Sequence, residues 1–173
     1  LILLLLIPIL SVGQIIKEGS RQIHLDFHTS GLIENIGENF SKEQFKKALK
    51  IGNVNSINIF GKGHHGYSYY NTKIGTRHPH LKFDLLKEQI EACHEMGVTA
   101  QVYFTVGWSQ KDADDHPEWI LKDKNGTTNK LEVLKKLGPN DRLPNFTWRL
   151  LAPSNGYDEF ILKQVEEICV NYD

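Results

Sequence analysis

The chain has little of several features that mark specialised classes of protein. It contains two cysteines in 173 residues, Cys93 and Cys169, which lie far apart in helix-like stretches. We expect them in the core rather than in a disulfide framework. Neither sign of charge is in excess, because 20 Lys and Arg residues balance 21 Asp and Glu residues. This balance gives no reason to expect nucleic acid or an anionic membrane as a partner.

Hydrophobic runs long enough to span a membrane, ~20 residues, are also missing. The run LILLLLIPIL covers residues 1–10, and the small residues Ser11 and Gly13 follow it. This pattern is typical of a signal-peptide core and its cleavage site. We therefore expect residues 1–13 to be a signal-peptide remnant and residues 14–173 to be the exported domain, periplasmic or extracellular and without stable membrane insertion. A buried strand or helix at the start of the domain is the alternative.

A phosphate-binding motif of the type Gly-Lys-Ser/Thr does not follow any expected strand. What the chain does have is an alternation of strand and helix patterns. RQIHLDFHTS alternates polar and apolar residues, which predicts a strand that ends at His28 or Thr29. Further strands are expected to start near residues 55 and 98. Helices are expected to begin at Ser41, after the capping residue Asp84, and near Gly156.

This order predicts parallel βαβ units and an α/β fold. Three strands alone do not distinguish a (β/α)8 TIM barrel, which typically has ~250 residues, from a doubly wound sheet. In either fold, ligands bind at the carboxyl ends of the strands. The polar and aromatic residues gather at those ends. They are Asp26, His28, Lys62, His64, His65, Tyr69, Tyr70 and Trp108.

Two chemistries fit these residue types. His24, Asp26 and His28 alternate along one strand, as in metal-dependent hydrolases of the amidohydrolase or phosphoesterase type. Sugar pockets use the same residue types in another way, since His, Asp, Lys and Trp side chains hold hydroxyl groups and an aromatic ring stacks on the sugar. The residues alone leave both alternatives open.

A resemblance to a known family favours the sugar pocket over the metal site. The stretch IFGKGHHGYSYYNTKIGTRHPHLKFDLLKEQIEACHEMGV, residues 59–98, resembles the second βα unit of the hypothetical glycosyl hydrolase 6 type. It is more distantly similar to family 29 α-L-fucosidases, in which a strand ending in Lys-His-His-Asp-Gly-Phe precedes a helix with Glu-Ala-Cys. HLDFHTS and DHPEWILKDKNG extend the resemblance over nearly the whole chain after the signal-like run. It implies the first three or so βα units of a TIM-barrel glycosidase (EC 3.2.1 type) that hydrolyses O-glycosidic bonds without a cofactor.

The resemblance also implies roles for particular residues. His28, His64 and His65 correspond to histidines that hold sugar hydroxyls, and Trp108 is expected to line the same pocket. Gly66 stands where the fucosidases have Asp, so the preference for fucose is an open point. Lys62 and Tyr69 are expected as further walls of the pocket.

The catalytic carboxylates are less well placed by the resemblance. The nucleophile Asp of the relatives lies at the end of a fourth strand, beyond Asp173, so the chain as written is expected to lack it and to be inactive. Asp26 is expected to support the pocket rather than to act as acid or base. His78 and His80 flank a proline and are expected to fix the path of a loop. The oligomeric state is not indicated.

Overall fold

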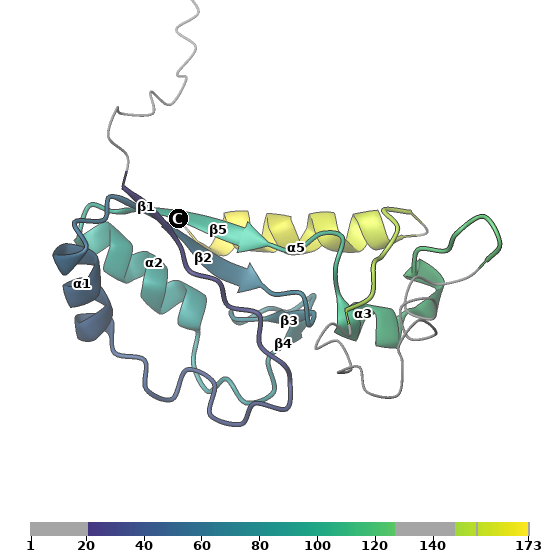
Figure 1. Ribbon diagram of the computed structural model, residues 1–173, viewed down its shortest axis with the longest axis horizontal. Coiled ribbons are helices and arrows are strands. Elements are labelled where there is room, and N and C mark those ends of the chain that lie inside the picture. Colours follow the sequence, from purple (N-terminus) through teal and green to yellow (C-terminus); the bar gives the residue numbers. More distant parts are fainter. Residues whose placement is uncertain (1–20, 127–147, 155, 173) are drawn as a thin grey trace, which may run out of the picture.

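Three parallel strands form the centre of the computed structural model, which describes residues 21–126, 148–154 and 156–172. The strand β2 (Ser56–Lys62) lies between β1 (Gln22–His24) and β5 (Thr99–Phe104). Two short strands, β3 (Tyr67–Ser68) and β4 (Thr76–Arg77), extend the sheet from the end of β2. The arrowheads of β2 and β5 in Figure 1 point toward α3, so the carboxyl ends of the strands lie at that side.

The helices follow the strands in the predicted order. They are α1 (Lys42–Ile51), α2 (Leu85–Glu95), α3 (Gln110–Asp115), the 3-10 turn η1 (Pro117–Trp119) and α5 (Tyr157–Asn171). Ser41 and Asp84 cap α1 and α2 through side-chain oxygens that accept backbone N–H groups, as the sequence predicted. The helix α3 and the turn η1 were not predicted, because elements of six and three residues are too short to show a 3.6-residue period.

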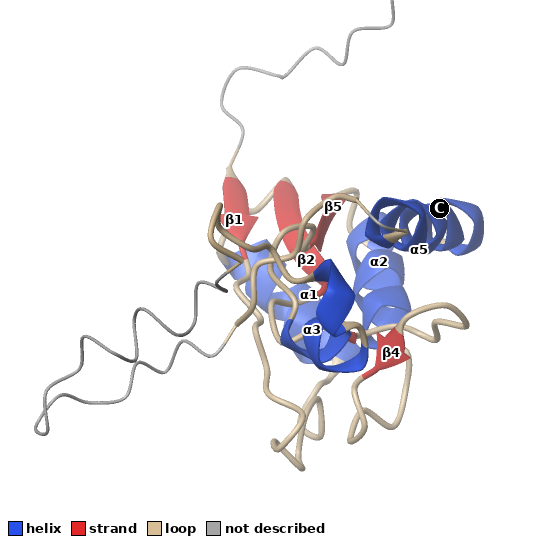
Figure 2. Ribbon diagram, turned by 90° about the vertical axis from the view of Figure 1, so that its right-hand side faces the viewer, coloured by secondary structure: helices blue, strands red, loops and turns tan. Residues whose placement is uncertain are grey.

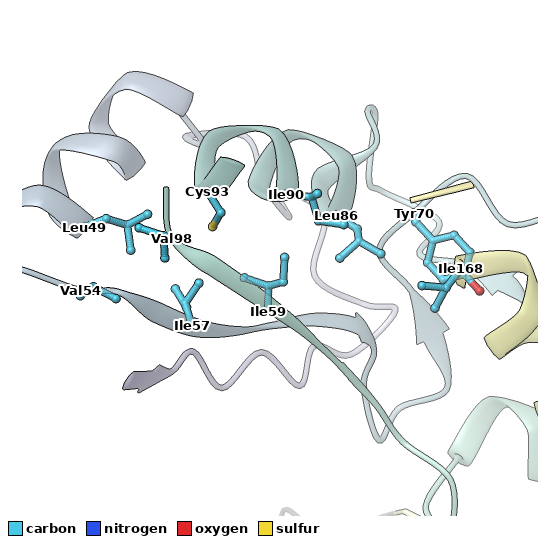
Figure 3. Packing of buried hydrophobic residues seen from close by; sticks show 10 residues of the cluster. All are labelled: Leu49, Val54, Ile57, Ile59, Tyr70, Leu86, Ile90, Cys93, Val98 and Ile168. Atoms are coloured by element: carbon cyan, nitrogen blue, oxygen red, sulfur yellow. The ribbon is translucent and has the colours of Figure 1, made fainter. Parts of the chain in front are cut away.

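One face of the sheet carries the main hydrophobic core. Ile57 and Ile59 of β2 are 2% and 0% exposed and pack against α1, α2 and α5 (Figure 3). Cys93 of α2 belongs to this core, and burial raises the pKa of its thiol to about 11. The prediction for Cys169 is wrong, because this residue is exposed on α5.

The opposite face of the sheet is polar near the amino ends of the strands and carries the stacked rings of Phe60 and Tyr103 toward their carboxyl ends. Gln22 of β1 is exposed, and its side-chain amide donates to Asn58 at 3.3 Å and to Gln101 at 2.6 Å. Figure 2 views the sheet from the end at which α3 lies and shows β1, β2 and β5 side by side. In the described part of the chain, the core that joins α1, α2 and α5 to the sheet therefore lies on one face.

The first strand is shorter than predicted. It ends at His24, and one further backbone hydrogen bond, from Leu25 to the Asn58 carbonyl at 3.1 Å, continues the pairing. Beyond it the chain is fixed by side chains instead. Tyr69 holds Thr29, and His78 lies 2.9 Å from the Ser30 carbonyl. The polar alternation continues past His24 in the sequence, although the backbone has already left the sheet.

None of the described helices is long and apolar enough to cross a membrane. The predicted signal-peptide remnant, residues 1–13, and Asp173 lie outside the described residues. Export of the protein therefore stays a prediction.

Candidate functional site

Three imidazoles meet at the carboxyl end of the sheet. His28 follows β1, and His64 and His65 follow β2. The rings of His28 and His64 stack with centroids 3.7 Å apart and an interplanar angle of 24°. The indole of Trp148 lies 5.3 Å from His28, 4.6 Å from His64 and 5.4 Å from His65. We call these four residues the histidine cluster.

The hydrogen bonds of His28 define which nitrogen carries its proton. The Nδ1 atom accepts the backbone N–H of His64 at 2.9 Å, so the proton is on Nε2. That nitrogen lies 3.2 Å from a carboxylate oxygen of Asp26. Burial lowers the pKa of His28 despite the opposing effect of Asp26. His28 is therefore a neutral ring with both nitrogens engaged, held between a carboxylate and the backbone of its neighbour.

His64 and His65 each have a ring nitrogen without a hydrogen-bond partner among the described residues. The Nε2 atom of His64 is 2.8 Å from the Tyr103 hydroxyl, whereas its Nδ1 atom is buried without a hydrogen-bond partner in the described structure. The Nδ1 atom of His65 is in the same situation. An unsatisfied buried polar group costs ~1–3 kcal/mol, so a ligand with hydroxyl groups would gain by pairing with these two nitrogens.

Burial keeps these rings uncharged. It is the largest cause that lowers the pKa of His64 to about 4, and the adjacent His28 adds to the effect. The pKa of His65 is lowered by burial in the same way. At neutral pH the histidine cluster therefore presents uncharged nitrogens beside an indole ring.

This lowered pKa predicts an acid-sensitive fold. The ring of His64 should titrate near pH 4 when its carbon-bound protons are followed by NMR. The unfolded chain binds this proton at ~pH 6.5, so between these values it holds more protons than the folded protein. The stabilising contribution is thus complete above pH 6.5 and is lost as the pH falls toward 4. A His64→Gln variant should lose stability less steeply over this window; identical slopes would contradict the assignment.

Tyr69 does not line the cluster, which corrects its predicted role. Its side chain is 0% exposed, and its hydroxyl accepts the Thr29 backbone N–H at 3.0 Å and lies 2.8 Å from the Thr29 hydroxyl. His78, also buried, pairs its Nε2 with the Ser30 carbonyl, in agreement with its predicted structural role. These two rings fix the segment that carries His28.

Removing the Tyr69 hydroxyl should therefore loosen that segment. We expect Tyr69→Phe to lower the free energy of unfolding by about 1–3 kcal/mol, because it leaves the buried Thr29 N–H unpaired. Hydrogen exchange of the Thr29 amide should become faster. Thr29→Val removes the second partner, and the two substitutions together should cost less than the sum of their separate effects. Strict additivity would show that the contact contributes nothing.

Lys62 is also placed differently from the prediction, which made it a wall of the pocket. The Lys62 side chain is 0% exposed and its ammonium lies 2.6 Å from a carboxylate oxygen of Asp112. It therefore points into the protein and does not reach the histidines. Trp108 lies at the margin of the cluster, with its ring 6.4 Å from that of His64.

Two residues of this region, Tyr103 and Trp148, were not predicted from the sequence. Tyr103 of β5 bonds His64 and stacks on Phe60 at 4.3 Å, and the period-2 pattern of its strand was a signal that could have found it. Trp148 had no such signal. It lies beside Arg149, whose carbonyl accepts the Ser109 N–H at 3.0 Å, and this pairing across a long loop is invisible in the sequence.

The metal-binding alternative gains no support from the described residues, among which no group of three or more His, Cys, Asp or Glu side chains is arranged to hold a metal ion. His24 packs on Phe60, with ring centroids 5.5 Å apart, and its Nδ1 is 3.3 Å from the Asn58 amide. His24, Asp26 and His28 thus do not converge on one point.

A cavity of about 310 Å³ lies elsewhere, between the loop before α1 and the loop before α2. Its walls are Glu34, Asn35, Ile36, Gly37, Glu38, Phe40, His80, Lys82 and Phe83. None of the four residues of the histidine cluster lines it. The polar atoms without partners make the cluster the better candidate site.

Comparison with known proteins shows the family to which the chain belongs. The family model described as hypothetical glycosyl hydrolase 6 matches residues 41–173. The chain belongs to this family. The matched range includes β2, the paired histidines and the helices α1, α2 and α5. The comparison with curated protein sequences gives no match.

Solved structures resemble this member of the family over most of its length. Alpha-L-fucosidase isoenzyme 2 from Paenibacillus thiaminolyticus is 40% identical with a TM-score of 0.77, over 88% of this chain and 22% of that enzyme. An alpha-L-fucosynthase from Thermotoga maritima is 19% identical with a TM-score of 0.52, over 79% of this chain and 26% of that one. The noncanonic maltogenic alpha-amylase AmyB from Thermotoga neapolitana is 16% identical with a TM-score of 0.54, over 88% and 36%. The last two show the fold alone.

Proposed function

We propose that this member of the hypothetical glycosyl hydrolase 6 family is part of a glycosidase that cleaves O-glycosidic bonds of a neutral sugar, in the manner of an α-L-fucosidase. The observation that carries the proposal is the histidine cluster, in which two buried, uncharged imidazole nitrogens lack partners beside Trp148. Such nitrogens pair with sugar hydroxyls, and an indole face stacks on the apolar side of a pyranose. The 40% identity to a fucosidase supports fucose as the sugar.

The proposed fold is the first three βα units of a (β/α)8 barrel. Three features support it. The strands β1, β2 and β5 are parallel, they neighbour one another in chain order, and one core joins α1, α2 and α5 to a single face of the sheet. A doubly wound sheet has helices on both faces and a reversal of strand order. The opposite face would be the barrel interior.

Within the described residues, Asp26 is the carboxylate that contacts the histidine cluster. Its oxygen faces the Nε2 proton of His28, so we assign it to holding that ring in place. A retaining glycosidase uses two carboxyl groups ~5 Å apart. We propose that these groups come from outside the described residues, since the fucosidase with 40% identity matches this chain over 22% of its own length.

We further propose export, with cleavage after residue 13, to the periplasm or the extracellular space. The support is the apolar run of residues 1–10 followed by small residues. Mass spectrometry of the secreted protein would give its first residue. A mature protein that begins before Ser11 would contradict this proposal.

The activity is tested on the longest natural reading frame that contains this chain. We expect it to hydrolyse 4-nitrophenyl α-L-fucopyranoside and to keep this activity in EDTA, because the proposed mechanism uses carboxylates and imidazoles. Loss of activity in EDTA would favour the metal-dependent alternative. Absence of hydrolysis together with absence of L-fucose binding would contradict the proposal for fucose.

A further inference from the structure

The buried ammonium of Lys62 has its partners on α3 and α5 rather than in the histidine cluster. Its Nζ atom lies 2.6 Å from Asp112 Oδ2 and donates to Gln164 Oε1 at 3.2 Å. The rings of Phe104 and Phe160 lie 5.5 and 5.3 Å away. Burial lowers the pKa of Lys62, and the Asp112 carboxylate opposes that effect. The ammonium thus ties the end of β2 to α3 and α5.

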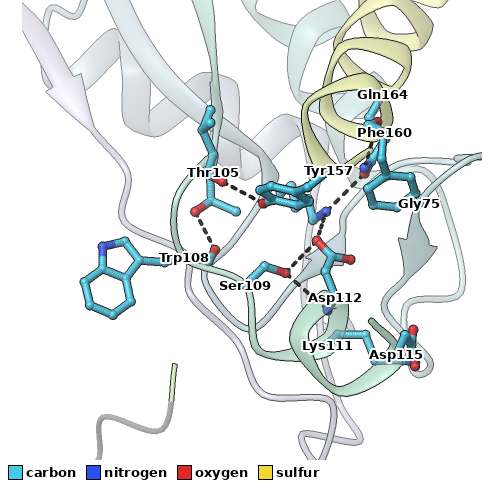
Figure 4. Close-up of polar contacts among 12 residues, drawn as sticks. Gly75, Thr105, Trp108, Ser109, Lys111, Asp112, Asp115, Tyr157, Phe160 and Gln164 are labelled. Atoms are coloured by element: carbon cyan, nitrogen blue, oxygen red, sulfur yellow. Dashed lines mark hydrogen bonds and ion pairs between the residues drawn. The ribbon is translucent and has the colours of Figure 1, made fainter. Parts of the chain in front are cut away.

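Asp112 is in the first turn of α3, where Ser109 caps the helix. The Ser109 hydroxyl donates to Asp112 Oδ2 at 2.7 Å and accepts the Asp112 N–H at 3.4 Å (Figure 4). One carboxylate oxygen therefore joins the Lys62 ammonium to the helix cap. Ser109 is 0% exposed and Asp112 is 2% exposed, so water does not compete for these contacts.

The same turn of α3 holds the backbone of the paired histidines. The Gln110 N–H donates to the His64 carbonyl at 3.1 Å, and the Lys111 N–H donates to the His65 carbonyl at 3.0 Å. These two bonds satisfy N–H groups that a helix start leaves without intrahelical partners. Any shift of α3 would therefore be passed directly to the residues whose rings form the cluster.

Gly66 shows how closely the segment of the paired histidines packs against the first turn of α3. A Cβ atom at this position would lie 2.5 Å from the Ser109 hydroxyl and 2.9 Å from the Lys111 nitrogen, and the φ angle is +88°. Another residue at this position would clash and would be strained. The departure of Gly66 from the Asp of the fucosidases is thus required by the close approach of α3.

We infer that Lys62 is a positioning residue of the proposed sugar site, which acts through Asp112 and the first turn of α3 to set the places of His64 and His65. A buried ion pair contributes little net stability compared with apolar residues of the same volume. Functional side chains, in contrast, must be held closely by the residues behind them. A test of this inference by sugar affinity rests on the proposed function, whereas a test by hydrogen exchange of the α3 amides does not.

The test is the double variant Lys62→Met with Asp112→Asn, made in the longest natural reading frame. It removes both charges while it keeps the volume and an acceptor for Ser109. We expect the Gln110 and Lys111 amides to exchange about tenfold faster relative to the amides of α2, the change in an equilibrium that corresponds to ~1.4 kcal/mol. The dissociation constant for L-fucose should rise by a similar factor.

The control is Asp115→Ala at the other end of α3, which should leave both amides and the affinity unchanged. If the double variant does not fold, Ser109→Ala tests the same connection by the loss of one hydroxyl group. Unchanged protection of the two amides, or a loss that the α2 amides share equally, would overturn the inference. If the wild-type protein does not bind L-fucose, the proposed function fails, while the amide measurement still decides the role of Lys62.

Discussion

Replacing Asp112 by alanine should lower the free energy of unfolding by about 3–5 kcal/mol, the effect of removing one partner of a buried ion pair. The side chains of Lys62 and Asp112 are 0% and 2% exposed, so the remaining ammonium would be buried without a counter-charge. The Ser109 hydroxyl would lose its acceptor as well. Urea unfolding followed by circular dichroism measures the change.

A matched control lies on the same helix. Asp115 pairs with Lys111 at i,i+4 spacing, but these side chains are 42% and 29% exposed. Asp115→Ala should therefore change the free energy of unfolding by no more than about 0.5 kcal/mol. Equal losses of unfolding free energy for Asp112→Ala and Asp115→Ala would show that burial does not make the Lys62 pair more important for stability than an exposed pair.

The pH dependence of Asp112→Ala gives a second check. Burial already lowers the pKa of Lys62, and removal of the opposing carboxylate should lower this pKa further. Between the lowered pKa of Lys62 in the folded variant and ~pH 10.4, the unfolded chain binds more protons than the folded variant, so stability rises with pH in that range. The deficit of the variant relative to wild type should shrink at alkaline pH. A deficit that grows with pH would contradict this account.

The starts of helices were predictable because local chemistry determines them. Ser41 and Asp84 cap their helices with their own side chains, so a few neighbouring residues carry the whole signal. The end of β1 was not predictable in this way. The polar alternation runs on through Asp26 and His28, but the contacts of Tyr69 and His78, far along the chain, decide where the backbone turns.

In the candidate site too, some features follow from local sequence and others depend on residues far along the chain. His28, His64 and His65 were placed near one another because carboxyl ends of parallel strands meet at one edge of a sheet. Lys62 is the last residue of β2, and its side chain turns inward toward Asp112, which lies fifty residues further on. A lysine at a strand end predicts a pocket wall or a buried pair equally well until that partner is known.

Trp148 illustrates what the sequence could not provide. It reaches the three imidazoles because Leu150 bridges Trp108, and Leu151 donates to the Gly107 carbonyl at 2.8 Å. Neither contact is indicated by a pattern among neighbouring residues of the sequence. The position of the indole proposed to stack on the sugar thus depends on backbone pairing between distant segments.

Replacing His64 by alanine should weaken the binding of L-fucose by about 10- to 100-fold, which corresponds to ~1.4–2.8 kcal/mol. The substitution removes the unpartnered Nδ1 atom proposed to bind a hydroxyl group, and it also removes the ring that stacks on His28 at 3.7 Å. His65→Ala should act in the same direction through its own Nδ1 atom. Isothermal titration calorimetry with L-fucose, on the longest natural reading frame, measures both.

Two further variants separate binding from folding. His94→Ala, at an exposed histidine of α2, should leave the affinity unchanged. His64→Gln keeps an amide that can pair with a hydroxyl group, so it should recover part of the affinity that His64→Ala loses. Because the His64 carbonyl is held by backbone N–H donation from Gln110, the alanine variant should keep the native path of its loop. Native affinity in both His64→Ala and His65→Ala would remove the paired histidines from the site, whereas a loss in His94→Ala would show that the effect is not local.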